Sequence, residues 1–137
     1  MTSDQLKAFN VKDVPAKELD VYGDTPFGRG CLAAVRLIQA GVRCVEVTLN
    51  GWDTHFTQDL AITGNIKSLG AGLAAFRRDM GARMATTTVV VMTEFGRTVR
   101  INGTGGTDHG TANNMIFLGG SLRQKGLHQR GQALGVG

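Results

Sequence analysis

Two short runs rich in valine flank one long helical pattern, and this order constrains the fold more than any other feature of the chain. The first run covers residues 42–49 and the second residues 86–93. Between them, apolar residues recur at spacings of three and four: Ile66, Leu69, Leu73, Phe76 and Met80. Apolar runs of this length are typical of parallel strands that are covered on both faces. A strand, a helix and a second strand form a right-handed βαβ unit, so we predict an α/β fold with a mostly parallel sheet flanked by helices.

The remaining patterns extend this prediction. A helical stripe with spacings of four, four and three is formed by Phe27, Cys31, Val35 and Ile38. Gly41 follows this stripe as a C-terminal cap would, and a third short strand is predicted at residues 115–118. A break near Gly64 is predicted in the long helix, since each interior glycine costs a helix up to about 1 kcal/mol relative to alanine.

The chain divides into two parts by composition. Residues 1–25 are polar and punctuated by Pro15 and Gly23, and they predict one short helix at most, followed by a connector. Residues 26–137 predict a partial α/β domain, because the polar, glycine-punctuated end supplies no element to cap the sheet. At 137 residues the chain has the size of one domain or of part of one.

Charge and hydropathy exclude several classes of protein. The net charge is +4, with the basic excess after Glu94, which favours an anionic ligand or a solvated basic surface. No cluster of basic residues is interleaved with aromatic residues, so we expect no nucleic-acid binding. No apolar run approaches the roughly 20 residues that span a bilayer. Cys31 and Cys44 are predicted as core thiols, with a disulfide between them left open.

Two glycine-flanked turns place acidic and imidazole side chains together, and they hold two of the three histidines. Asp53 and His55 lie in the first turn, and Asp108 and His109 lie in the second. Carboxylate oxygens and imidazole nitrogens suit zinc, manganese or iron, of which zinc and manganese are our predicted cofactors. Such pairs also occur as solvent-exposed hydrogen-bonding pairs or as helix caps, and these alternatives stay open.

Further candidate residues follow the predicted strands or lie in the polar tail. In open α/β sheets ligands bind at the carboxyl ends of the strands, and Glu94 directly follows such an end. Arg97 either pairs with Glu94 or neutralises an anionic substrate held by the metal. His128 is either an exposed histidine or a further imidazole ligand.

Four separated motifs in this order resemble one known family, catalogued as domain of unknown function 1501. The motifs are Asp24 to Gly30, Gly51 to His55, Glu94 to Thr98 and Gly106 to Gly110. This family is similar to a sulfatase-like branch of the alkaline phosphatase superfamily. The resemblance implies a parallel-sheet α/β fold and a two-metal site that hydrolyses phosphate or sulfate esters. It also implies that Asp108 and His109 bind one metal, and that Asp53 and His55 bind the other, at a shorter spacing than the superfamily's usual one.

The resemblance further implies that the site is divided along the sequence. In the superfamily the nucleophile and another metal-binding aspartate come from the first strand of the domain, and nothing in this chain matches them. We therefore expect the isolated chain to be an inactive part of a metallohydrolase whose substrate is an anionic small-molecule ester. Relatives are often exported, so a periplasmic or exported location is expected if a leader precedes Met1. The alternatives are a non-catalytic surface or binding module with the same fold, and a purely structural domain.

Overall fold

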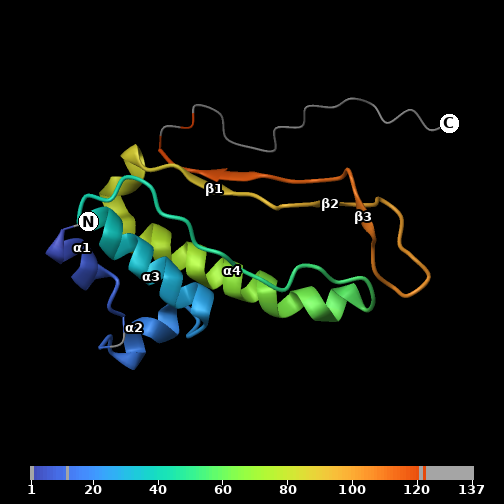
Figure 1. Cartoon of the computed structure of the whole chain (residues 1–137), viewed down its shortest axis with the longest axis horizontal. Helices are drawn as coiled ribbons and strands as arrows, with labels where there is room; N and C mark the ends of the chain where they lie inside the picture. The colour runs from blue at the N-terminus through green and yellow to red at the C-terminus, as the bar shows by residue number, and fades with distance from the viewer. Residues whose placement is uncertain (1, 12, 121, 123–137) are drawn as a thin grey trace.

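A helix pair covered by extended chain forms the centre of the molecule (Figure 1). The computed structural model describes residues 2–11, 13–120 and 122. The helices are α1 (Ser3–Ala8), α2 (Ala16–Val21), α3 (Pro26–Gln39) and α4 (Gln58–Met80), followed by a 3₁₀ helix, η1 (Gly81–Thr86). The strands are β1 (Val89–Val91), β2 (Gly96–Arg97), β3 (His109–Gly110) and β4 (Ile116–Leu118). Within this described part, no helix is both long and apolar enough to cross a membrane.

The predicted helical stripe at residues 27–38 is confirmed as α3. The side chain of Thr25 caps its first turn by accepting a hydrogen bond from the backbone N–H of Gly28 at 3.0 Å. Pro26 occupies the first helical position, where its missing N–H costs nothing. Gly41 follows the end with a φ of +85°, a left-handed conformation that glycine adopts without a steric penalty.

The long helical pattern is also confirmed, but the predicted break near Gly64 is wrong. α4 runs without interruption from Gln58 to Met80. Packing against α3 offsets the low helix propensity of its glycines. Gly72 shows how close this packing is, because a Cβ atom there would lie 2.7 Å from the ring of Phe27 and 3.1 Å from Sγ of Cys31.

Two apolar clusters make up the core, and both include residues of α3 and α4. The first cluster joins α2, α3 and α4 through Val14, Leu19, Tyr22, Phe27, Cys31, Leu32 and Ala75. The second joins α3 and α4 through Ala34, Val35, Phe76 and Met80. Cys31 is buried, and this burial raises the pKa of its thiol to about 11. Cys44 is exposed and both thiols are free, so the prediction of a core thiol holds for Cys31 alone.

The predicted parallel sheet is wrong. In the part of the chain that the structure describes, the strands form two separate antiparallel pairs, β1 with β4 and β2 with β3. In the first pair Val90 lies opposite Phe117, and in the second Arg97 lies opposite His109. The predicted third strand at 115–118 is thus present, but as the antiparallel partner of β1. A run of β-branched residues indicates a strand without specifying its neighbour, and here that neighbour arrives from the opposite direction.

The first predicted strand, residues 42–49, belongs to no sheet in the described structure. It runs alongside the helix pair (Figure 1), with Val45, Val47 and Leu49 packed against the core clusters. Among the described residues no βαβ unit forms, because no two strands there are paired in parallel. The N-terminal region also differs from the prediction, since residues 2–25 contain two short helices, α1 and α2, instead of one.

Candidate metal centre

Two loops that are far apart in the sequence meet at the start of α4. The loop of residues 51–57 leads into this helix, and the loop of residues 102–108 leads into β3. Backbone N–H groups of Thr57 and Gln58 donate to the carbonyl oxygens of Thr104 and Gly105, each at 3.2 Å. Gly106 allows the contact, since a Cβ atom there would lie 2.3 Å from the carbonyl oxygen of His55. Glycine at this position is therefore a condition for the two loops to touch.

The β2–β3 pair depends on these loops for its place in the molecule. Among the described elements, β2 and β3 contact each other but contact none of the helices. Figure 1 shows them above the first turns of α4, near the loop that precedes this helix. Bonds between the two loops, and contacts from Arg97 and His109 to the loop of residues 51–57, thus hold this strand pair against the helical part of the chain.

Three of the predicted ligands lie together where the loops meet. Nε2 of His109 is 2.7 Å from Oδ1 of Asp53, and Nε2 of His55 is 3.0 Å from the same oxygen. One ligand atom from each of Asp53, His55 and His109 can be chosen so that all three lie within 4.8 Å of one another. Two imidazoles and one carboxylate are a ligand set found in zinc sites that keep a further coordination position open.

Asp108 is not part of this three-residue group but contacts one member of it, His55. Its Oδ1 atom is 3.2 Å from Nδ1 of His55, the ring nitrogen that does not face Asp53. Histidines that bind a metal commonly donate their other ring N–H to a carboxylate, which fixes the tautomer and the orientation of the ring. The arrangement thus places Asp108 as a partner of a ligand, whereas the sequence predicted it as a ligand itself.

Both carboxyl groups have lowered pKa values. A hydrogen bond to His109, followed by the hydrogen bond to His55, lowers the pKa of Asp53 below its usual value of 3.8. Asn102 is the main cause of the lowered pKa of Asp108, and His55 contributes as well. Both groups are therefore ionised at neutral pH, which is the form in which a carboxylate binds a cation or accepts a hydrogen bond. The side chains of Asp53, His55 and His109 are 61%, 40% and 50% exposed, so the group is open to solvent.

Asn102 joins the two loops, although no sequence pattern predicted it as a site residue. Its side-chain N–H₂ group donates to the carbonyl oxygen of His55 at 2.8 Å and to Oδ1 of Asp108 at 3.1 Å. Its Oδ1 atom accepts from the backbone N–H groups of Thr104 and Gly106, each at 3.0 Å. An asparagine directly before glycine is a recognisable turn signal, but that signal predicts only the local bonds and not those to His55.

Arg97 joins the same loops from β2. Its guanidinium donates to the carbonyl oxygens of Thr54 at 2.6 Å and of Thr107 and Trp52 at 2.5 Å. It also lies over the ring of Phe95, with Cζ 5.0 Å from the ring centroid. The ion pair with Glu94 that the sequence left open is not formed in the described structure, where Glu94 is exposed and lies outside the three-residue group. His128 lies outside the described residues.

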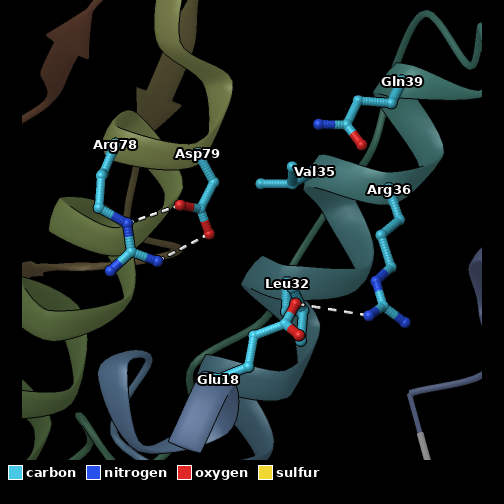
Figure 2. Close-up of a pocket in the computed structure, with 7 residues that line it drawn as sticks. All are labelled: Glu18, Leu32, Val35, Arg36, Gln39, Arg78 and Asp79. Carbon is cyan, nitrogen blue, oxygen red and sulfur yellow. Dashed lines mark hydrogen bonds and ion pairs between the residues drawn. The ribbon is translucent and has the colours of Figure 1, made fainter. Parts of the chain in front are cut away.

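A hollow between α2, α3 and α4 lies away from these loops (Figure 2). It encloses about 350 Å³, and charged side chains of both signs line it. Arg78 donates to both oxygens of Asp79, at 2.6 and 2.9 Å, and Arg36 donates to Glu18 at 3.4 Å. The arginines of this hollow already have acidic partners, so they are not available to bind an anion. The two loops are therefore the stronger candidate for a functional site.

Comparison with known proteins finds one relationship. A family model described as "Protein of unknown function (DUF1501)" matches residues 1–135. The comparisons with curated proteins and with solved structures found no match.

Proposed function

Since the chain belongs to the DUF1501 family, we propose a function for it from the geometry of its two loops: it supplies part of a divalent-metal site in a hydrolase of phosphate or sulfate esters. The observation that carries this proposal is the group of Asp53, His55 and His109, whose ligand atoms lie within 4.8 Å of one another. The expected cation is zinc or manganese, because imidazole nitrogen suits zinc and carboxylate oxygen suits both metals.

Each residue of the group has a separate task. Asp53, whose pKa is lowered by hydrogen bonding to His109, supplies the negative ligand. His55 and His109 supply neutral nitrogen ligands, and Asp108 orients His55 through Nδ1. A divalent cation held by this group would provide Lewis-acid chemistry, drawing electron density from an ester oxygen. The exposure of all three side chains leaves room for an anionic ester to approach.

We assign Arg97 to the positioning of the loops and not to the substrate anion. Three of its N–H groups are used on the carbonyl oxygens of Trp52, Thr54 and Thr107. Those carbonyls flank Asp53, His55 and Asp108 in the sequence, so the guanidinium fixes the backbone from which these side chains project. This differs from the anion-binding role that the sequence suggested.

Ester hydrolysis by this chain alone is not expected, because no residue of it matches the superfamily's nucleophile. The competing proposal is a binding module that holds the cation without catalysis in any context. The two proposals agree on metal binding, so the metal site is tested first and turnover is tested separately.

Calorimetric titration of the protein with zinc and with manganese tests the site. We expect one cation per chain, with binding lost in Asp53→Ala and in His109→Ala. Asp59→Asn is the matched control, since it removes an exposed acidic group that is outside the ligand group and four residues from His55. Failure of both metals to bind, or equal binding by Asp53→Ala, would refute the metal site. Hydrolysis of p-nitrophenyl phosphate by the zinc-loaded chain, abolished by Asp53→Ala, would contradict its expected inactivity.

A further inference from the structure

Residues 43–49, termed the open segment below, have the side-chain pattern of a β-strand but no strand beside them. Exposure alternates along the segment from Cys44, so that every second residue is partly covered. Val45, Val47 and Leu49 pack against the core clusters of the helix pair. Cys44, Glu46 and Thr48 are exposed on the opposite face. A period of two is the pattern of an extended strand that lies flat on a helical layer.

The backbone of the open segment is unpaired. Within the part of the chain that the structure describes, its N–H and C=O groups make no hydrogen bond, although Val42 directly before it donates to Leu37 at 2.9 Å. Unpaired strand edges pair readily with another extended chain, because each N–H and C=O group gains a partner there.

A hollow of about 350 Å³, lined mostly by apolar residues, lies along this segment. On the segment side it is lined by residues 45–48, and its helical side includes Ala33, Ala34 and Leu37 of α3. Phe9 and Val11, from the chain after α1, add to the apolar part of the wall. Arg29 of α3 is its basic member, and the guanidinium of Arg29 is paired with Asp24. Some proteins bind a peptide as an additional β-strand, and they do so at an unpaired backbone edge beside a hollow that accepts side chains. The backbone supplies affinity, and the hollow selects alternate side chains.

We propose that the open segment and its hollow form a binding site for an extended peptide segment of a partner protein, which adds as a β-strand. Alternate residues of the added strand point toward the helices, and these should be apolar to fill the hollow. The residues between them lie on the exposed face beside Glu46, whose carboxylate forms no ion pair with any described residue. Opposite charges on neighbouring strands attract, so basic residues are expected there. This site does not depend on the metal centre.

A labelled peptide with the sequence Thr-Val-Lys-Val-Lys-Val-Thr provides the probe, and fluorescence anisotropy measures its binding to the whole chain. Two control peptides carry backbone N-methyl groups, one at the valines and one at the lysines. A β-strand pairs through one edge, so one control should bind like the parent peptide and the other at least about tenfold more weakly. Equal binding of all three peptides, or no binding of the parent peptide, would refute the proposal.

Two variants locate the site on the protein. Ala33→Phe should fill the hollow and weaken binding about tenfold or more, whereas Ala61→Phe, on an exposed part of α4, should leave it unchanged. Glu46→Lys, on the exposed face, should weaken binding of the lysine peptide and strengthen that of its glutamate counterpart, and it serves as the test if Ala33→Phe does not fold. Hydrogen exchange should slow in residues 43–49 when the peptide binds. Slowing at β1 and β4 alone, or self-association of the chain through residues 43–49 without peptide binding, would assign the edge to another partner and refute the proposal.

Discussion

Asp108 contacts His55 at Nδ1, at 3.2 Å, while the other ring nitrogen of His55 faces Asp53 at 3.0 Å. One imidazole thus lies between two carboxylates that have different tasks in the proposed site. When Nδ1 carries the proton and donates a hydrogen bond to Asp108, Nε2 is left free as a metal ligand. This relationship separates a residue that binds the cation from a residue that orients the ligand.

We expect Asp108→Ala to lower zinc affinity by about 10- to 100-fold, the usual effect of removing the partner of a ligating histidine, while one zinc still binds per chain. Asp108→Asn should recover part of the loss, because its amide oxygen can still accept from Nδ1. Calorimetric titration measures both variants. Complete loss of binding in Asp108→Ala, equal to that in Asp53→Ala, would show that Asp108 is itself a ligand.

Arg97→Lys should weaken both the fold and the metal site. The single ammonium group of lysine cannot make the three hydrogen bonds that the guanidinium donates to Trp52, Thr54 and Thr107. Hydrogen bonds that involve a charged group contribute about 1.5–3 kcal/mol. We expect a loss of this order in the free energy of unfolding in urea, together with weaker zinc binding. The exposed Arg100 offers the control Arg100→Lys. An effect no larger than that of the control would remove the assigned positioning role.

Two glycines of α4 should respond in opposite directions to the same substitution. At Gly64 an added Cβ meets nothing within 4 Å, so Gly64→Ala should stabilise the protein by up to about 1 kcal/mol through helix propensity. At Gly72 the Cβ would press on Phe27 and Cys31, and overpacking of this kind costs about 1–3 kcal/mol. Thermal and urea unfolding of both variants provide the measurement, and stabilisation by Gly72→Ala would contradict the close packing of α3 against α4.

The stability contributed by Asp79 should depend on pH. Hydrogen bonding to Arg78, and then to Tyr22, lowers the pKa of Asp79 below its usual 3.8 in the folded protein. A carboxyl group with a lowered folded-state pKa stabilises the fold above its unfolded-state pKa, and this contribution disappears as the pH falls through the folded-state value. The difference in unfolding free energy between the wild type and Asp79→Asn should therefore be larger at pH 7 than at pH 3. A difference that is constant over this range would contradict the shift.

Local patterns predicted the helices well and the sheet poorly, for a physical reason. α3 and α4 are stabilised by bonds and contacts within a few residues and by one apolar stripe each, and both features can be read from spacing. The strand at Val89–Val91 needs a partner from elsewhere in the chain, and the spacing of valines does not say whether Phe117 or another residue lies opposite Val90.

In the candidate site, too, local patterns were informative and contacts between distant residues were not predicted. Glycine-flanked Asp-His pairs indicated which residues would meet, and the structure brings Asp53, His55 and His109 together. The place of Asp108 behind His55, and the bonds from Arg97 and Asn102 to distant carbonyl oxygens, depend on how the two loops are folded against each other. No local spacing rule contains that information.

The absence of direct contacts between the β2–β3 pair and the helices has a consequence for how the molecule would come apart. Segments with few buried apolar contacts open at a lower free energy than the core does. A cation held jointly by Asp53 and His109 would act as a crosslink between two segments that are far apart in the sequence, reducing the entropy gained when that strand pair detaches. Release of the ion and local unfolding of the β2–β3 pair would then occur together. A chelator would therefore destabilise this strand pair more than the rest of the protein.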